Sequence, residues 1–311
     1  MTPTPTSSPR RDSGEGSRAT GRDVHPPAFA VREAVSRALA EDLAALGDLT
    51  SALLPPDAEA TAAFVPRADG VISGLLCVDE TFRQVATQLI DEDVTVRWEV
   101  DDGEQIRAGR PIGDVTGRLA AILTAERTAL NFLGHLSGVA TLTARFVAAV
   151  SAAGGALRVL DTRKTTPGLR ALEKAAVRAG GGANHRGNLS DWVLLKDNHL
   201  AVMPIPDAVA AARRRWPGRT VQVECVDIDM VREAVRANAD AVLLDNMTPE
   251  VVRSVVDEVR SAHTSPPWLE ISGGVDMETI GAFATTGADA VSIGALTHSA
   301  PVLDIGLDVA G

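Results

Sequence analysis

The sequence predicts an α/β protein in which a small α/β domain precedes a parallel β/α barrel. Between residues 60 and 116, short β-branched runs alternate with Asp-Gly and glycine turns. From residue 157 onward, short runs that are apolar throughout alternate with helical patterns, which is typical of a parallel sheet covered on both faces. A chain of 311 residues, 45% of them hydrophobic, is long enough to bury both cores.

Composition excludes several classes of function. The net charge of −11, the pI near 5.0 and the absence of tyrosine argue against a nucleic-acid surface. Two cysteines, Cys77 and Cys225, provide neither a disulfide framework nor a cysteine-based zinc site, so we expect buried thiols in a reducing, cytoplasmic compartment. Apolar runs fall short of the ~18 residues that a membrane helix needs, so we expect no membrane partner.

The N-terminal part begins with a segment unlike the rest. Residues 1–27 are rich in Pro, Ser, Thr, Gly and Arg and contain no apolar stretch, so we expect a disordered tail rather than a secretory signal. Helical periodicity covers residues 29–46 and stops at Gly47, a typical helix terminator. The patterns that follow predict a helix at 79–90 and strands at 60–65, 71–75 and 94–100.

A long helical stretch at 120–153 leads into the barrel. Within it, Gly134 and Gly138 either break the helix or let another segment approach closely. The predicted barrel strands then lie at 157–160, 192–195, 221–226, 241–244, 269–271 and 290–293. Helices are predicted at 168–179, 207–216, 228–237, 249–263 and 277–286. Six such units favour a barrel over a doubly wound sheet, which stays open as an alternative, although no strand is followed by GxGxxG.

Polar residues follow the barrel strands at the points where the strands end. In a parallel barrel these ends share one mouth, where active sites lie. The residues are Asp161, Arg163, Lys164, Lys196, Asp197, Asn198, Glu224, Asp245, Asn246, Ser272, Gly273, Gly274, Gly294 and Ala295. Residues 158–196 carry eight basic and three acidic side chains, a net +5 in an acidic chain, which indicates a small polyanionic ligand.

These residue types divide into three roles. Arg163, Arg186 and Lys196 suit carboxylates, because arginine offers a planar fork and lysine a point charge. The carboxylates of Glu224 and Asp245 are hard oxygen ligands suited to Mg²⁺. The glycine loops bring main-chain N–H groups close to a phosphate.

Several of these side chains also have a structural interpretation. Arg170, Lys174 and Arg178 follow one helix face at i, i+4 and i+8, which is typical of a solvated stripe, with Glu173 as an ordinary helix pair. His135 on an apolar helix is expected to be a core or capping histidine. By contrast, His185 lies in a glycine-rich loop beside Arg186 and is better placed for a ligand.

The strings DTRKTTPG, HRGNLSD and LLKDNH, in this order, resemble the quinolinate phosphoribosyltransferase family. GDLTS, TAERTALNFL, VECV, LLDNM, ISGGV and SIGALTHS extend the resemblance over nearly the whole chain after the tail. It implies an N-terminal α/β sandwich domain at 28–138, with 299–311 as a candidate to pack back on it. It also implies a slightly open, seven-stranded, incomplete TIM-like α/β barrel at 139–298.

The resemblance further implies the site and the assembly. The quinolinate site would comprise Arg127, Thr162, Arg163, His185, Arg186 and Lys196. Three residues, Lys164, Glu224 and Asp245, would be catalytic and face phosphoribosyl pyrophosphate, with Glu224 and Asp245 holding Mg²⁺. The phosphate cradle would comprise Ser272, Gly273, Gly274, Ile293, Gly294, Ala295 and His298. Arg127 would reach the partner's site in a homodimer, with higher assembly left open.

The implied reaction joins phosphoribose to the quinolinate ring nitrogen and releases pyrophosphate and CO₂, giving nicotinate mononucleotide for NAD synthesis. Three alternatives remain at this stage. One is a related phosphoribosyltransferase that uses a different acceptor. Another is a Schiff-base aldolase on the same barrel with Lys196 as its nucleophile. The third is a ligand-binding protein without turnover.

Overall fold

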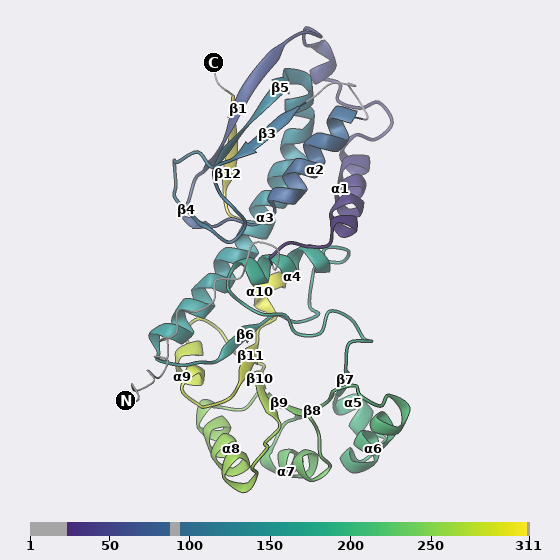
Figure 1. Ribbon diagram of the computed structural model, residues 1–311, viewed down its shortest axis with the longest axis vertical. Helices are drawn as coiled ribbons and strands as arrows, with labels where there is room; N and C mark the ends of the chain where they lie inside the picture. The colour runs from purple at the N-terminus through teal and green to yellow at the C-terminus, as the bar shows by residue number, and fades with distance from the viewer. Residues whose placement is uncertain (1–23, 88–93, 310–311) are drawn as a thin grey trace, which may run out of the picture.

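A computed structural model describes residues 24–87 and 94–309 and shows an antiparallel sheet with covering helices beside a parallel barrel (Figure 1). The N-terminal elements are α1 (Ala28–Asp42), the 3₁₀ turn η1 (Ser51–Leu53), β1 (Glu59–Pro66), β2 (Gly70–Val71), α2 (Leu75–Val85), β3 (Thr95–Trp98), β4 (Gln105–Ile106), β5 (Gly113–Arg118) and α3 (Leu119–Ala152). The antiparallel sheet has the order β12-β1-β5-β3, and α1, α2 and α3 lie on one of its faces (Figure 1).

The barrel follows α3 as a run of strand–helix units. These are β6 (Arg158–Leu160), α4 (Arg170–Ala179), β7 (Val193–Leu195), α5 (Asp197–Leu200), α6 (Ile205–Arg215), β8 (Val221–Cys225), α7 (Ile228–Arg236), β9 (Ala241–Asp245), α8 (Pro249–Ala262), β10 (Trp268–Ser272), α9 (Ile280–Ala284), β11 (Ala290–Ser292) and α10 (Ala295–His298). The strands pair in parallel in the order β6-β11-β10-β9-β8-β7. The predicted α/β barrel is therefore confirmed.

The expected seventh barrel strand is reduced to a single contact. Ala183 forms one isolated parallel bridge with Leu160 on the free edge of β6. The glycine run at 180–182 approaches α3 too closely for larger side chains, since a Cβ on Gly180 would lie 2.3 Å from the Ala140 oxygen. The Ala183 segment and β7 thus form the two edges of a barrel that does not close by hydrogen bonding within the described residues.

One strand prediction in the N-terminal part was wrong, and two other predictions extend beyond the described residues. Residues 71–75 are not a strand, because β2 ends at Val71 and α2 begins at Leu75. Residues 88–90 of the predicted 79–90 helix lie outside the described residues. The same holds for residues 1–23 of the predicted tail. At its other end, Val24 is buried, and the main-chain oxygen of His25 accepts a hydrogen bond from Arg178 Nη2 at 3.0 Å.

Helix α3 is continuous and connects the two halves of the molecule, so residue 138 lies within it (Figure 1). It contacts α2 of the N-terminal part, and it also contacts α4, α9 and β6 of the barrel. By length and mean hydropathy, 1.3, it could cross a membrane, yet more than half of that stretch is buried inside the protein. These contacts identify α3 as a core helix.

The glycines of α3 allow a second segment to cross it. A Cβ on Gly138 would lie 2.1 Å from the Pro301 oxygen, and one on Gly134 would lie 2.9 Å from the Leu303 oxygen. The crossing segment continues into β12 (Ile305–Val309), which pairs with β1. Of the two alternatives for these glycines, close approach is correct.

We predict that Gly138→Ala destabilises the protein by about 1–3 kcal/mol, because the added methyl group meets main-chain atoms that cannot rotate away. The matched control is Gly281→Ala in α9, where a Cβ would meet nothing within 4 Å. Thermal unfolding of both variants checks this. Equal melting temperatures for the two variants would contradict the close crossing.

Candidate active site

The carboxyl ends of the barrel strands meet at one mouth, because parallel pairing fixes their register. Ser272 at the end of β10 pairs with Asp245 of β9 on one side and with Ser292 of β11 on the other. Glu224, in β8, and Lys196, directly after β7, continue the same edge. Side chains from separate strands therefore converge as the sequence predicts.

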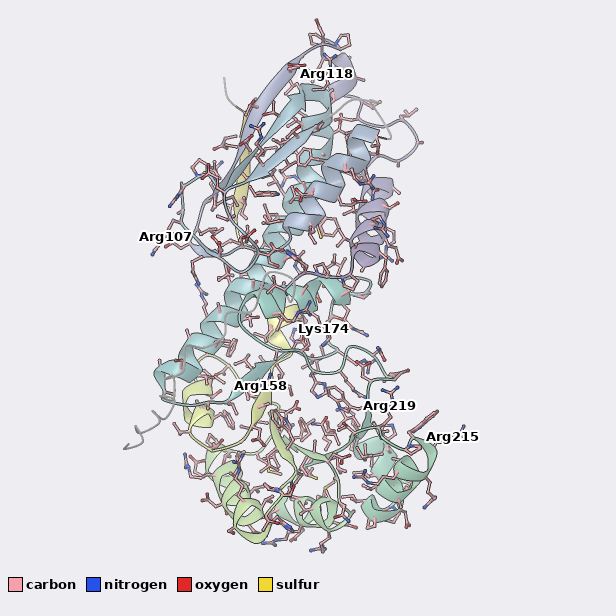
Figure 2. The ribbon with its side chains drawn as sticks, in the orientation of Figure 1. Arg107, Arg118, Arg158, Lys174, Arg215 and Arg219 are labelled. Atoms are coloured by element: carbon pink, nitrogen blue, oxygen red, sulfur yellow. The ribbon has the colours of Figure 1, made fainter. Side chains whose placement is uncertain are left out.

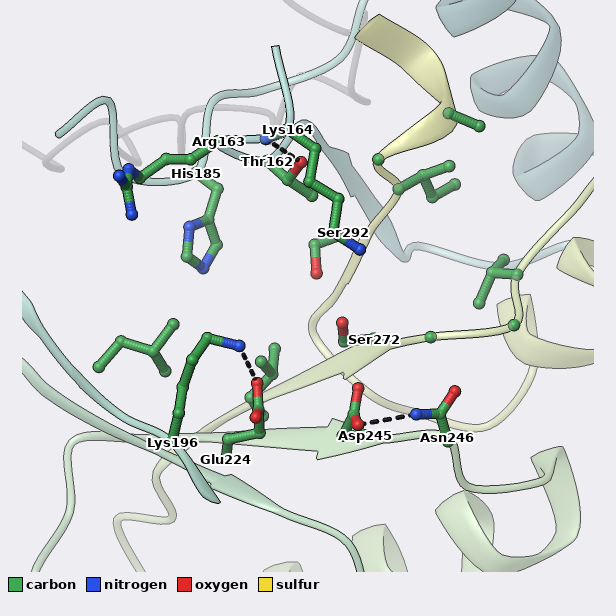
Figure 3. Close-up of a pocket in the computed structure, with 18 of the residues that line it drawn as sticks. Thr162, Arg163, Lys164, His185, Lys196, Glu224, Asp245, Asn246, Ser272 and Ser292 are labelled. Carbon is green, nitrogen blue, oxygen red and sulfur yellow. Dashed lines mark hydrogen bonds and ion pairs between the residues drawn. The ribbon is translucent and has the colours of Figure 1, made fainter. Parts of the chain in front are cut away.

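A pocket of about 890 Å³ occupies this mouth (Figure 3). Of the strand-end residues, Asp161, Asp197 and Asn198 do not line it, whereas Asn246 does. All but one of the residues predicted for the quinolinate and phosphoribosyl pyrophosphate sites line it: Thr162, Arg163, Lys164, His185, Arg186, Lys196, Glu224, Asp245, Ser272, Gly273, Gly274, Ile293, Gly294, Ala295 and His298. The exception is Arg127, which is exposed on α3 and does not line the pocket of its own chain. Sequence reasoning did not assign Ser292 to the site, although its place at the end of an apolar strand was a usable signal.

Two arginines give one side of the pocket an unsatisfied positive charge. Arg186 is only 8% exposed. Burial lowers the pKa of its guanidinium below the ordinary value, and the charge of Arg163 lowers it further. The Nε atom of Arg163 is buried and has no hydrogen-bond partner among the described residues. Two cations that repel each other beside an unused donor indicate an anionic ligand that accepts from both.

Acidic and cationic side chains meet on the opposite wall. The Lys196 ammonium contacts the Glu224 carboxylate, and Asn246 Nδ2 donates to Asp245 Oδ2 at 2.7 Å (Figure 3). Three carboxylates line the pocket, those of Glu224, Asp245 and Asp276. No group of three or more His, Cys, Asp or Glu side chains within the described ranges is arranged to hold a metal by itself. Two carboxylates still fit Mg²⁺, which completes its shell with water and substrate oxygens.

The third wall is formed by two loops that contain glycine. Gly273 and Gly274 have φ of +81° and +64°, and a Cβ on Gly273 would lie 2.2 Å from Asn246 Oδ1. On the facing loop, a Cβ on Gly294 would lie 3.0 Å from His298 Nε2. Main-chain N–H groups are therefore accessible to a ligand from both loops, as in phosphate-binding loops.

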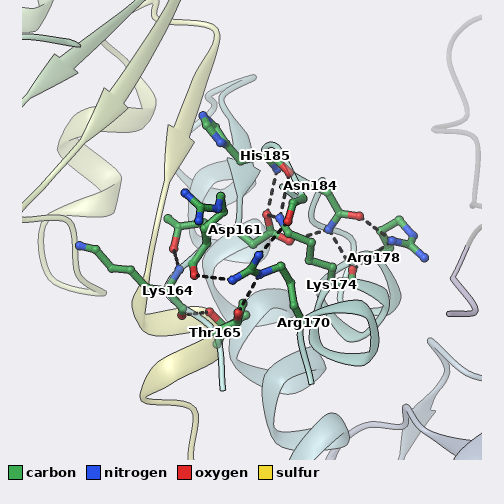
Figure 4. A network of polar contacts seen from close by, with 12 residues as sticks. Asp161, Lys164, Thr165, Arg170, Lys174, Arg178, Asn184 and His185 are labelled. Carbon is green, nitrogen blue, oxygen red and sulfur yellow. Dashed lines mark hydrogen bonds and ion pairs between the residues drawn. The ribbon is translucent and has the colours of Figure 1, made fainter. Parts of the chain in front are cut away.

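A buried ion pair supports the two loops that carry the pocket's cations (Figure 4). Asp161 is fully buried and contacts the Lys174 ammonium, while it accepts hydrogen bonds from Asn184 Nδ2 at 2.6 Å and from the His185 main-chain nitrogen at 2.9 Å. Lys174 Nζ also donates to the His185 main-chain oxygen at 2.8 Å. Burial raises the pKa of Asp161 and lowers that of Lys174, in each case against the effect of the pairing.

The predicted solvated stripe on α4 was therefore wrong. Lys174 is 6% exposed, and Arg170 is half-buried, with Nη1 donating to the Gly187 oxygen at 3.0 Å. Glu173 is not an ordinary helix pair, because its buried carboxylate contacts His135 Nε2 at 2.9 Å and accepts from the Thr166 nitrogen. Helix α4 packs under the DTRKTTPG and HRGN loops, so its charged side chains satisfy loop main chain instead of water.

A parallel α/β barrel with paired arginines, two carboxylates and a glycine-lined cradle at its carboxyl mouth defines an enzyme class that binds anionic, phosphorylated ligands. Family models described as quinolinate phosphoribosyl transferase, N-terminal domain and C-terminal domain, match residues 48–137 and 139–308. The chain belongs to the quinolinate phosphoribosyl transferase family.

Individual relatives agree with this assignment. A carboxylating nicotinate-nucleotide pyrophosphorylase of Mycobacterium leprae is 40% identical over 286 residues, which cover 90% of this chain and 97% of that protein. A probable enzyme of the same name from Bacillus subtilis is 38% identical over 85% of this chain and 88% of its own. The solved nicotinate-nucleotide pyrophosphorylase of Francisella tularensis superposes with a TM-score of 0.85 at 36% identity, covering 93% of this chain and 99% of that one.

Proposed function

We propose that this chain transfers phosphoribose from phosphoribosyl pyrophosphate to the ring nitrogen of quinolinate and releases pyrophosphate and CO₂. The product, nicotinate mononucleotide, serves NAD synthesis. The observation that carries the proposal is the pair of guanidiniums of Arg163 and Arg186 beside the glycine loops. Arg163 Nε has no hydrogen-bond partner among the described residues, and a ligand carboxylate would provide one. Quinolinate provides two adjacent carboxylates, and phosphoribosyl pyrophosphate provides the phosphates.

The chemistry needs orientation and positive charge more than a nucleophile from the protein. The ring nitrogen attacks ribose C1 while the C1–O bond to pyrophosphate breaks and pyrophosphate takes the electron pair. The ring is then a pyridinium, so its C2–carboxylate bond can break, with the electron pair left beside N⁺ and then protonated. Arg163, Arg186 and His185 would hold the dicarboxylate, and Lys164 would lie against the phosphoribosyl group.

We propose Mg²⁺ as the cofactor, with Glu224 and Asp245 as the residues that hold it. When bound, the ion would neutralise charge that builds up on the departing pyrophosphate. The support is the donor set, two carboxylates on neighbouring strands at the mouth of the barrel.

We predict that Asp245→Asn lowers kcat/KM for phosphoribosyl pyrophosphate at least about tenfold and raises the Mg²⁺ concentration needed for half-maximal rate, because an amide is a weaker ligand than a carboxylate. Steady-state rates over a magnesium titration measure both. The control is Asp257→Asn, the same change on the exposed side of α8. An Asp245→Asn enzyme with the wild-type magnesium dependence would rule out this ligand.

We further propose a homodimer in which Arg127 reaches the partner's pocket. Arg127 is exposed on α3 and does not line the pocket of its own chain. It also lies in the TAERTALNFL string, one of the strings through which the chain resembles the family. Both observations support the proposal. The proposal includes a cytoplasmic location, which the two buried, unpaired cysteines support.

Subunit mixing tests this arrangement. Arg127→Ala and Lys164→Ala should each abolish most activity alone. In a mixed dimer, one of the two sites combines an intact barrel with an intact Arg127. Random exchange should therefore restore about a quarter of the wild-type rate per subunit. Failure of the mixture to exceed the separate variants, with exchange shown by native mass spectrometry, would contradict a shared site.

One observation bears on the aldolase alternative. A Schiff-base lysine needs its amine free to attack a carbonyl group, whereas the side-chain nitrogen of Lys196 contacts the Glu224 carboxylate. We therefore assign Lys196 to anion binding.

A further inference from the structure

Four side chains below the pocket form a closed ring of contacts around His185. His185 Nε2 lies 3.3 Å from Glu270 Oε1. Glu270 Oε2 accepts from Gln222 Nε2 at 3.0 Å, and Gln222 Oε1 accepts from Trp192 Nε1 at 3.0 Å. The Trp192 ring then packs against the His185 ring with centroids 4.8 Å apart. Each member of the ring therefore restrains the next.

The ring spans the place where the barrel does not close. His185 follows the Ala183 bridge, which is one edge of the barrel, and Trp192 directly precedes β7, the other edge. Gln222 and Glu270 approach from β8 and β10 inside the barrel. The contacts among them thus position His185 across a seam that lacks strand pairing.

Of these four side chains, His185 lines the large pocket, whereas those of Glu270, Gln222 and Trp192 do not. The main-chain oxygen of Trp192 also accepts a hydrogen bond from Arg186 Nη1 at 3.4 Å, which does not involve the Trp192 ring. All four line a second cavity of about 370 Å³ that lies toward the amino ends of the strands. Glu270 would therefore act on a ligand through His185 and not by touching it, which makes it a positioning residue.

The buried carboxylate of Glu270 is expected to lower the stability of the barrel core. It is 2% exposed, and its Oε1 makes no hydrogen bond of good geometry within the described part of the chain. A buried, incompletely satisfied carboxylate lowers stability, and apolar or amide replacements are often neutral or better. Such a residue is more readily explained by the site it serves than by packing.

We infer that Glu270 holds the His185 imidazole so that it can donate from Nδ1 to a carboxylate of quinolinate. A ring with one proton on Nε2 has only an acceptor at Nδ1, which would repel an anion. The Glu270 carboxylate beside Nε2 is the partner that a ring with donors at both nitrogens would need. The inference rests on the proposed function and adds a residue that determines affinity for the acceptor.

The test compares Glu270→Gln, His185→Ala and the double variant with the wild type, in the quinolinate assay. Glu270→Gln should raise the quinolinate KM about tenfold, the size of one charge-assisted hydrogen bond, and leave the phosphoribosyl pyrophosphate KM within about twofold. In the double variant, Glu270→Gln should add nothing to the loss caused by His185→Ala. The melting temperature of Glu270→Gln should equal or exceed the wild type. The control, Glu258→Gln on the exposed side of α8, should change neither KM.

The outcomes distinguish failure of the proposed function from failure of the inferred role of Glu270. A folded wild type that makes no product from quinolinate overturns the proposed function and the inference with it. An active wild type with an unchanged quinolinate KM in Glu270→Gln, or with additive losses in the double variant, overturns the inference alone. If Glu270→Gln does not fold, Trp192→Phe replaces it, because it keeps the stacking and removes only the donor to Gln222. An unchanged quinolinate KM in Trp192→Phe then overturns the inference.

Discussion

Arg186→Ala is expected to lower kcat/KM for quinolinate by on the order of 10²–10³-fold, and Arg163→Ala to have an effect of similar size. Removing one partner of a buried charge pair costs roughly 2–5 kcal/mol, partly because the remaining charge is left without its partner. The two guanidiniums lie close enough for the charge of Arg163 to lower the pKa of Arg186. A bound dicarboxylate relieves that repulsion, so the loss should appear in both KM and kcat.

Two further variants show whether the effect depends on geometry or only on charge. Arg186→Lys keeps the charge but loses the planar fork, so it should recover only part of the activity. Arg213→Ala removes a surface partner of Asp240 outside the pocket and should leave the kinetics unchanged. Wild-type constants in both Arg163→Ala and Arg186→Ala would refute the assignment of this wall to quinolinate.

Lys174→Ala is expected to destabilise the protein by about 3–5 kcal/mol, since it leaves the fully buried Asp161 carboxylate without its cation. The comparison is Arg260→Ala, which breaks an exposed pair with Asp289 and should cost less than about 1 kcal/mol. Asp161→Asn in the Lys174→Ala background should restore part of the stability, because the amide can still accept from the His185 nitrogen without carrying a charge.

The loss in Lys174→Ala should also depend on pH in a defined direction. Burial already raises the pKa of Asp161 above its ordinary value of 3.8, and removal of the lysine raises it further. A carboxyl whose pKa is higher in the folded state contributes stability below its unfolded pKa and loses it as the pH rises. The deficit relative to wild type should therefore grow as the pH rises above the ordinary carboxyl pKa of 3.8 in denaturant titrations. A deficit that shrinks over this range would contradict a buried, unpaired carboxylate.

The sequence was sufficient to predict the barrel mouth, for a physical reason. Parallel register places the ends of successive strands together, so apolar runs that end in Asp245 and Ser272 bring these side chains to one edge whatever the loop conformations. The same logic fails for Lys174. Helical spacing assigns a face to a residue, but whether that face meets water depends on loops packed over it from elsewhere in the chain.

Arg127 and Glu270 show two other limits. The helical pattern places Arg127 on a helix surface, and the structure agrees. Its proposed role in the site therefore requires the partner subunit. Glu270 had a readable signal, because it is the single charge in the apolar strand β10. Its partners could not be predicted, since Gln222 and His185 belong to elements that only the closed sheet brings together.

The central claim is best tested by mass spectrometry of the products formed by the purified protein with phosphoribosyl pyrophosphate, Mg²⁺ and either quinolinate or nicotinate. The account predicts nicotinate mononucleotide and CO₂ from quinolinate, and no product from nicotinate, because the arginine pair requires both carboxylates. Folded, dimeric protein that makes no mononucleotide from quinolinate would contradict the account and point to a different acceptor.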